Sequence, residues 1–293
     1  MADKKMTEEE KAFLERRRQL GEKMMEAERR LRSRDYPKAI AILEEVTASV
    51  EAEVLEEEEK YQYLHFPNQI ELILYKVLWK QEKPIRYATF PFSVVYPMQA
   101  AAYKHQKRYE EALQILQKDL HWDPASADAL LDCAEIQKQL GRDEKAFEDA
   151  VSAPKLAYTP KQLTKGYTII ADVLKEKDPA CAKACLQLAL AYTPQDGPAY
   201  RALEAIDPEK KIETSEEGLE KAAKEHGFPV GADPDVLSIL VSYGDGYKQE
   251  KQYEMALDLY SCAYGLTHDE DLGKTVQELS TLFEERAAGK EKE

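Results

Sequence analysis

The residue types best able to do chemistry are few in this sequence, and they are poorly grouped. Cys181 and Cys185 are four positions apart, so a helix would place both thiols on one face, where they could share a metal ion. A closed zinc site needs about four ligands, and no histidine lies within twenty residues of this pair. We therefore interpret both cysteines as small packing residues, and we expect neither a metal site nor a cofactor.

Familiar catalytic motifs are also missing. The five histidines are scattered, and none belongs to an HExxH zinc motif. The sequence holds no phosphate-binding P-loop, no GxSxG nucleophile elbow and no protein-kinase signature. The acidic residues around Asp233 and Asp269 lack the ligand order and the central glycine of a calcium-binding loop. The sequence thus predicts no catalytic residues, and we expect a protein that is not an enzyme.

Composition narrows the classes of partner. The 293 residues carry a net charge of −15, and because nucleic-acid binding needs a basic face, we expect no nucleic-acid partner. No apolar run approaches the length of a membrane-spanning helix, and the N-terminal residues lack the apolar core of a secretory signal. The four cysteines show no CxxC spacing, which favours reduced thiols. These features predict a cytoplasmic protein with no membrane partner.

A fixed repeat runs through the chain. Residues 156–160 (LAYTP) recur as residues 190–194, an offset of 34 residues, and Ala112 and Ala146 are separated by the same distance. Ala182 follows Ala146 after 36 residues. Periods in this range are typical of solenoids built from helical hairpins.

These repeats resemble the tetratricopeptide repeat (TPR) family, whose pattern has small residues at positions 8, 20 and 27, an aromatic residue at 11, an aromatic or apolar residue at 24 and proline at 32. Small residues at 8 and 20 let the two helices of a hairpin approach closely, and proline stops the second helix. The chain is more similar to bacterial TPR proteins than to the peptide-clamp type. The matches are in repeats 20–53 (Ala27, Ala39, Leu43), 93–126 (Ala100, Tyr103, Ala112, Leu116, Pro124), 127–160 (Ala134, Ala146, Ala150, Ala153), 163–196 (Ala182, Leu186, Ala189, Pro194) and 237–270 (Gly244, Tyr247, Ala256, Tyr260, Ala263).

The resemblance implies an all-α fold. We expect a single superhelical TPR solenoid over residues 1–293, with about five recognisable and two degenerate helical hairpins and with capping helices. Its expected parts are a charged N-terminal capping helix at 1–34, the first hairpin half plus a divergent hairpin at 35–92, three well-matched repeats at 93–196, a divergent hairpin and loop at 197–236, and the last repeat with a C-terminal capping helix at 237–293.

Two stretches depart from the repeat pattern, and we expect each to be a degenerate hairpin. Residues 54–92 contain a glutamate-rich run and then an apolar helix over residues 66–81. Pro84 stands where alanine is expected, and Pro91 and Pro97 indicate a kinked or late-starting helix in the next repeat. Residues 197–236 are predicted to form a short helix at 198–206, a polar link at 207–215, a second helix at 216–226 and a loop rich in Gly and Pro at 227–235.

The inner face of a TPR stack is lined by fixed positions of the first helix of each hairpin, so the resemblance supplies candidate binding residues. Their most regular feature is a ladder of lysines, which would suit an acidic peptide or a free carboxylate. Helix dipoles and acidic residues three positions earlier also account for such lysines, and this structural explanation is the stronger one. The candidate groove residues are Lys104, Glu135, Lys138, Tyr167, Lys175, Asp245 and Lys248.

The resemblance leads us to expect a non-catalytic adaptor or scaffold that binds a protein or peptide in the groove, with binding weakened by charge reversal at Lys104 and Lys138. The carboxylate clamp of TPR co-chaperones is absent, because its lysine and asparagine positions hold other residues. The alternatives are an accessory or regulatory subunit of an enzyme, or an enzyme with its site in residues 90–97 or 227–235. An apolar stripe on the N-terminal helix would also allow a homodimer, through Phe13, Leu20, Met24, Ala27 and Leu31.

Overall fold

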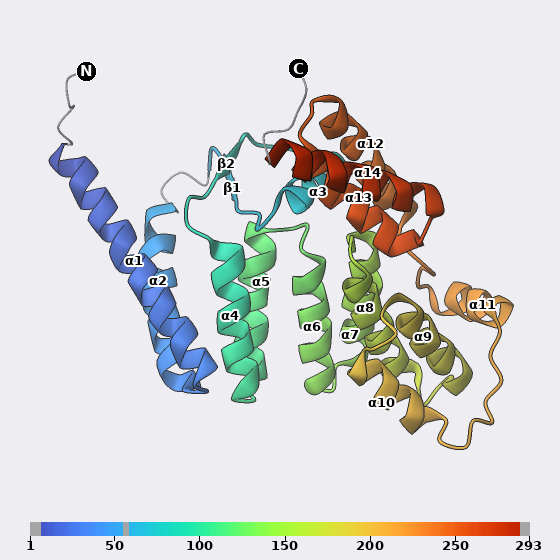
Figure 1. Ribbon diagram of the computed structural model, residues 1–293. Coiled ribbons are helices and arrows are strands. Elements are labelled where there is room, and N and C mark those ends of the chain that lie inside the picture. Colours follow the sequence, from blue (N-terminus) through green and yellow to red (C-terminus); the bar gives the residue numbers. More distant parts are fainter. Residues whose placement is uncertain (1–6, 55–58, 288–293) are drawn as a thin grey trace. The chain divides into compact units, whose positions relative to one another are not determined.

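The computed structural model describes residues 7–54 and 59–287, which are mainly helical (Figure 1). None of the helices in these ranges is both long and apolar enough to cross a membrane. The helical-hairpin architecture predicted from the repeat is confirmed. The elements in chain order are α1 (Glu8–Arg32), α2 (Tyr36–Val54), β1 (Gln62–Leu64), α3 (Gln69–Leu78), β2 (Ile85–Tyr87), α4 (Phe92–His105), α5 (Tyr109–Trp122), α6 (Ala127–Gln139), α7 (Asp143–Ser152), the short 3-10 helix η2 (Ala153–Lys155), α8 (Pro160–Leu174), α9 (Pro179–Tyr192), α10 (Gly197–Ile206), α11 (Glu216–His226), α12 (Pro234–Gln249), α13 (Tyr253–Thr267) and α14 (Glu270–Ala287).

The chain folds into two compact units, which we describe separately. Unit 1 comprises residues 1–67 and 81–124, and unit 2 comprises residues 68–80 and 125–293. The backbone therefore leaves unit 1 to form α3 in unit 2, returns to form β2, α4 and α5, and then completes unit 2. The repeat pattern alone predicts one continuous stack, in which the backbone would not pass between two units in this way.

Unit 1 is built from two helical hairpins around an aromatic core. α1 packs on α2 and α4 packs on α5, and the two hairpins meet where α2 contacts α4. The Phe92 ring stacks on the Trp122 ring with their centroids 3.8 Å apart, and the Phe90 ring meets Phe92 edge-on. Aromatic side chains of this size supply much of the apolar area that a two-hairpin unit can bury.

α1 is the charged helix at the N-terminal end of the described residues, and part of its apolar stripe packs inside unit 1. Ala27 is fully buried in the core, and Leu20 and Met24 pack against that core. The side chain of Phe13 lies outside the described residues. Because these residues of the stripe already contact the core of unit 1, a homodimer formed through them would compete with that packing.

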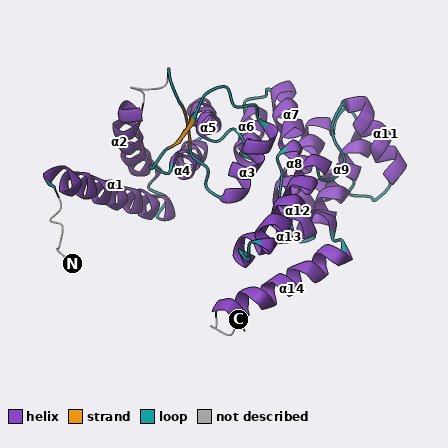
Figure 2. Cartoon of the chain, turned by 90° about the horizontal axis from the view of Figure 1, so that it is seen from above, coloured by secondary structure: helices purple, strands orange, loops and turns teal. Residues whose placement is uncertain are grey.

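The helical hairpin predicted at residues 54–92 does not form. The described part of this segment holds the end of α2 and then one helix, α3, between two short strands; β1 and β2, coloured orange in Figure 2, pair in parallel with Gln62 opposite Ile85. Pro84 explains the difference, because proline lacks the N–H that a second helix needs and favours an extended residue before it. Its carbonyl accepts a hydrogen bond from the Gln62 N–H at 3.0 Å, which begins the strand pairing. Residues 55–58 of the glutamate-rich run lie outside the described residues.

The prolines of the next repeat do not delay α4. The helix begins at Phe92, directly after Pro91, and continues through Pro97. A residue just before a helix has no intrahelical donor to lose, so Pro91 is tolerated there. Pro97 removes one internal hydrogen bond, but Val95 and Tyr96 beside it are fully buried, and this packing holds the helix together. The predicted late start is therefore wrong.

Unit 2 contains the hairpins α6–α7, α8–α9 and α12–α13, and α14 packs on α13. Side-chain caps fix where its helices begin. Ser126 accepts a backbone hydrogen bond at the start of α6, and Thr159 and Gln162 form a reciprocal capping box at the start of α8. Asp178 and Asp233 cap α9 and α12 in the same way.

The repeat columns have the burial that close-packed hairpins require. Ala112, Ala146, Ala182 and Ala256 are all fully buried in the second helices of their hairpins. Gly244, in α12, leaves room for an aromatic neighbour on α13. Small residues at these positions let the paired helices approach, as the repeat pattern predicts.

The divergent stretch at residues 197–236 contains the two helices that the sequence predicts. Ser215 caps α11, and Gly227, at a φ of 80°, ends it. Both α10 and α11 pack on α9. The link between them is held by an ion pair of Lys183 and Asp207, whose charged atoms are 2.7 Å apart. Asp207 also accepts two backbone N–H groups of the link, which fixes its path.

Helix α3 is anchored in unit 2 by packing and by a polar network. It packs on α12, while α13 contacts α8. Asn68 caps α3, and its amide donates to the Tyr158 hydroxyl at 2.9 Å. That hydroxyl donates in turn to the buried Glu71 carboxylate at 2.8 Å. The turn before α8 is therefore joined to a helix about ninety residues earlier in the chain.

Candidate functional site

One face of unit 2 carries a pocket of about 320 Å³. Its walls come from α6, α8 and the start of α10, which are the first helices of successive repeats. Most of the lining side chains are charged, and Ile169 adds apolar surface. The lining residues are Glu135, Lys138, Gln139, Lys161, Lys165, Thr168, Ile169, Asp172, Asp196 and Pro198.

Helix α8 forms the central wall because its polar residues recur at helical spacing. Lys161, Lys165, Thr168 and Asp172 are three or four positions apart, so they share one face of the helix. Leu163, on the other side, is fully buried. Gln162 of the capping box also donates to the Asp128 carboxylate of α6 at 2.9 Å, which ties the start of α8 to α6.

Lys165 is tied to the neighbouring repeat. Its ammonium group contacts the Asp132 carboxylate and lies 3.5 Å from Glu135 Oε2, both on α6. Burial disfavours the charged form of this lysine, but the carboxylates of Asp132, Glu135 and Asp128 outweigh burial and raise the pKa of Lys165. The side chain is therefore a fixed cation in the wall between two repeats.

The central lysines of the predicted ladder are also paired. Lys138 Nζ lies 3.0 Å from Asp143 Oδ1 and 3.7 Å from Asp172 Oδ2, and Lys175 pairs with Asp172 at 2.7 Å. Asp172 thus bridges two ladder lysines. Lys175 therefore pairs with the acidic residue three positions before it, as the structural explanation of the ladder expects. Lys138 differs, because Glu135, three positions before it, pairs with Lys165.

The remaining ladder residues do not line this pocket. Lys104 lies on α4, in unit 1. Lys248 is on α12 and pairs with Glu278 of α14 at 3.5 Å, and Asp245 accepts the Tyr260 hydroxyl at 2.7 Å. The pocket therefore gathers Glu135 and Lys138 from the predicted groove set.

Tyr167, predicted to face a ligand, is fully buried. Its hydroxyl accepts the Gly231 N–H at 2.7 Å and lies 3.1 Å from the Pro229 carbonyl oxygen, to which it can donate. Burial raises the pKa of Tyr167, so the phenol stays protonated. The side chain fastens the loop after α11 to α8, and the expectation that it meets a ligand is wrong.

A change in turn length explains this error. α8 begins 33 residues after α6, whereas α9 begins 36 residues after α7. The repeat at 163–196 was aligned through its second helix, so positions in its first helix were shifted by three residues. Three residues turn a helix by about 300°, so Tyr167 lies about 60° around the helix from the residue at the intended position. The spacing of Lys161, Lys165 and Asp172 is the signal that would have found the correct face.

The two divergent segments considered as enzyme sites have structural roles. Phe90 and Tyr96, in residues 90–97, belong to the core of unit 1. Ser93 Oγ contacts His65 Nδ1, but among the residues that the structure describes no carboxylate orients this imidazole as in a catalytic triad. In residues 227–235, Phe228 is buried.

A comparison with family models matches residues 104–147 to the tetratricopeptide repeat. This region runs from the end of α4 to the middle of α7. No curated protein sequence matches this chain.

Several solved structures align with most of this chain at low identity. The APC/C hetero-tetramer Cut9–Hcn1 aligns with 87% of the chain at 16% identity and a TM-score of 0.37, and the P58(IPK) TPR domain aligns with 91% at 14% and 0.33. A tetratricopeptide repeat protein from Parabacteroides merdae ATCC 43184 aligns with 90% at 12% and 0.35. The covered shares of those three chains are 48%, 80% and 98%, so this chain spans about half of the first. The scores are too low for us to transfer any feature of those proteins.

Proposed function

The chain is a tetratricopeptide repeat protein, and on this premise we propose that it is a non-catalytic adaptor that holds another protein or a peptide against α6, α8 and α10. The observation that carries the proposal is the 320 Å³ pocket between the first helices of successive repeats. Repeat stacks present extended surfaces of this kind to protein partners. Rigid helices rather than loops supply its walls, so the surface is formed before the partner arrives.

The chemistry of the lining favours a partner segment that joins an acidic group to an apolar one. Lys161 is exposed at the pocket and makes no ion pair within the described part of the chain. Lys138 and Lys165 already have carboxylate partners, so Lys161 is the lysine of the pocket best able to pair with an acidic group of a partner. Ile169 and the aliphatic stem of Lys165 supply apolar contact. We propose that an acidic side chain or a terminal carboxylate meets Lys161.

The wider setting that we propose is the cytoplasm, without nucleic acid and without a membrane as partner. The cysteines support this location, because Cys133, Cys181, Cys185 and Cys262 form no disulfide bond with one another. The net charge of −15 opposes binding to phosphate backbones.

The test is affinity purification of the tagged full chain from its host lysate, followed by mass spectrometry. The wild type is compared with Lys161→Glu, and Lys177→Glu serves as the matched control. Lys177 lies just after α8, is exposed and does not line the pocket, so both variants make the same change in net charge in the same repeat.

Lys161→Glu should weaken capture of the specific partner by roughly three- to ten-fold, because an exposed ion pair contributes about 0.2–1 kcal/mol and reversal replaces attraction with repulsion. Lys177→Glu should capture the partner as the wild type does. If both variants lost partner capture equally, net charge would explain the effect, and the pocket would no longer be the proposed binding site. Absence of any specific partner for the wild type would overturn the adaptor role.

A further inference from the structure

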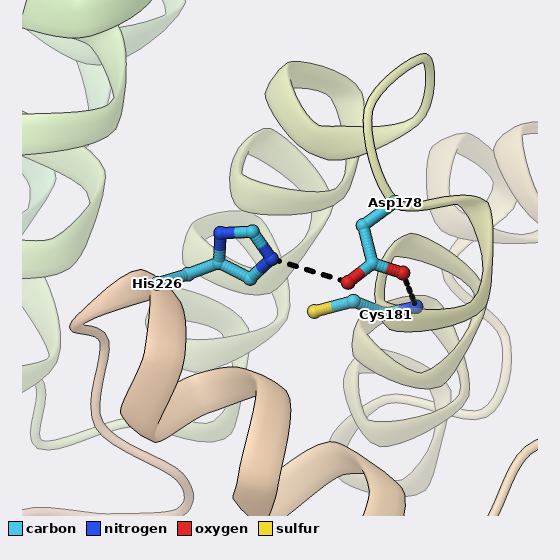
Figure 3. A group of neighbouring side chains, drawn as sticks. All are labelled: Asp178, Cys181 and His226. Atoms are coloured by element: carbon cyan, nitrogen blue, oxygen red, sulfur yellow. Dashed lines mark hydrogen bonds and ion pairs between the residues drawn. The ribbon is translucent and has the colours of Figure 1, made fainter.

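Three metal-ligating side chains meet where α9 contacts α11 (Figure 3). The Asp178 carboxylate, the Cys181 thiol and the His226 imidazole each offer one donor atom, and these atoms all lie within 4.8 Å of one another. Within residues 7–54 and 59–287, this is the one group of three or more such side chains that comes so close. The cluster is separate from the pocket of α6, α8 and α10.

The fold, and not the spacing along the chain, assembles this cluster. Asp178 is the cap of α9, Cys181 lies in its first turn, and His226 is the last residue of α11, 45 positions after Cys181. Gly227 follows at a φ of 80° and turns the chain away, which keeps His226 at the helix end. No histidine is near Cys181 in sequence, but one is near it in space.

Hydrogen bonds fix the orientation of the Asp178 carboxylate beside the other two donors. Asp178 Oδ1 accepts the Cys181 N–H at 3.0 Å, and Asp178 Oδ2 lies 3.1 Å from His226 Nε2. Figure 3 shows both contacts, with the thiol beside the imidazole. The backbone hydrogen bond to Cys181 is the main cause that lowers the pKa of Asp178, and His226 adds to it. The carboxylate is therefore ionised and fixed.

Thiolate, imidazole and carboxylate together form a donor set typical of zinc, with bond lengths of about 2.0–2.3 Å. Donors around such an ion are about 3–4 Å apart, so a shift of about 1 Å would close the cluster onto it. Cys181 is only 3% exposed, which shields the thiol from bulk water.

A second hollow, of about 370 Å³, adjoins the cluster. Asp178 and Cys181 stand in its wall, together with Ser215, Gly218 and Leu219 from the start of α11 and the residue before it. Three protein ligands leave one tetrahedral position, and this hollow gives water a route to it.

We propose that Asp178, Cys181 and His226 bind one divalent transition-metal ion, best matched by zinc, with water as the fourth ligand. On binding, the Cys181 thiol releases its proton to solvent. The proton on His226 Nε2 that faces Asp178 moves through solvent to Nδ1 of the same imidazole, and the freed Nε2 lone pair binds the metal. Two anionic ligands then balance the charge of the ion. The metal joins the start of α9 to the end of α11 and so fastens the divergent stretch to the regular repeats.

Cobalt(II) is the probe for the test, because it takes zinc sites and its thiolate complexes absorb in the near ultraviolet. The full chain is stripped with a chelator and titrated with Co²⁺, and Zn²⁺ is then added in competition. Cys181→Ser removes the thiolate and His226→Gln removes the imidazole. Cys262→Ser, a thiol change on α13 away from the cluster, is the control.

We expect one Co²⁺ per chain, with a thiolate charge-transfer band that Zn²⁺ abolishes. The band should vanish in Cys181→Ser, persist in Cys262→Ser, and require at least ten-fold more Co²⁺ in His226→Gln. Zinc should also slow amide hydrogen exchange in α11 of the wild type but not of Cys181→Ser. A band that survives in Cys181→Ser, or the lack of any band in a folded wild type, would overturn the proposal.

Discussion

Gly244 offers the sharpest test of how closely two helices pack in this chain. A Cβ atom at this position would lie 2.8 and 2.9 Å from two carbons of the Tyr260 ring. Tyr260 is 5% exposed, and its hydroxyl donates to Asp245 at 2.7 Å, so the ring has little freedom to move aside. Gly246, two residues later in the same helix, has no atom within 4 Å of an added Cβ. Comparing alanine at Gly244 with alanine at Gly246 therefore separates the steric cost of the contact with Tyr260 from the general effect of replacing glycine in a helix.

Alanine at either position should gain about 1 kcal/mol from helix propensity. At Gly244 that gain is opposed by overpacking, which costs about 1–3 kcal/mol. Because the propensity gain is the same for both variants, Gly244→Ala should be less stable than Gly246→Ala by about 1–3 kcal/mol. Gly246→Ala should be more stable than the wild type by up to about 1 kcal/mol.

The assay is urea unfolding of both variants and the wild type, combined with native-state hydrogen exchange of amides in α12 and α13. Hydrogen exchange reports opening of this hairpin even where a repeat protein does not unfold in one step. In a Tyr260→Leu background, Gly244→Ala should lower the free energy of unfolding by less, because the ring that the added Cβ would meet is absent. Equal stability of Gly244→Ala and Gly246→Ala would refute the reasoning.

Two further changes test other parts of unit 2. Tyr158→Phe removes the hydroxyl that joins Asn68 to the buried Glu71, and it should lower the free energy of unfolding by about 1–3 kcal/mol; Tyr200→Phe, at an exposed ring, should change the urea midpoint little. Burial, helped by Glu148, raises the pKa of Asp149 to about 6. The pKa of Asp149 is higher in the folded than in the unfolded state, so as pH rises the unfolded chain loses this proton at a lower pH than the folded chain does. The contribution of Asp149 to the free energy of unfolding therefore falls as pH rises from about 4 to 6. Asp149→Asn should therefore match the wild type in thermal melts near pH 4 and exceed it at pH 7, and an unchanged difference across that range would contradict the assignment.

The regular hairpins could be predicted from the sequence because their signals are local. Buried alanines such as Ala112 and Ala146 recur at the repeat period, and caps at residues such as Ser215 mark helix starts. Residues 216–226 were predicted as a helix with the observed bounds, since Ser215 and Gly227 enclose them. Local propensity and tertiary packing agree at these positions.

The parts that failed depend on contacts between distant residues. Pro84 prevents the second helix expected in residues 54–92, and strand β2 forms after it by pairing with residues more than twenty positions earlier. The expected place of Tyr167 is wrong because one turn differs in length by three residues, although the spacing of the charged residues on α8 marks the correct face. His226 reaches Cys181 only through the packing of α11 on α9. The strand pairing and the position of His226 both need knowledge of the fold before these residues can be assigned a role.

The early position of α3 in the chain affects synthesis of the protein. α3 emerges 165 residues before α12, its packing partner, and about ninety residues before Tyr158, its hydrogen-bond partner. At about 5–20 residues per second, this interval lasts roughly ten to thirty seconds, during which α3, whose Ile73, Leu74 and Tyr75 are buried in the folded protein, lacks its contacts with α12. The C-terminal repeat therefore covers a helix that was synthesised long before it. A chain truncated before α12 would leave this face of α3 exposed to chaperones and proteases.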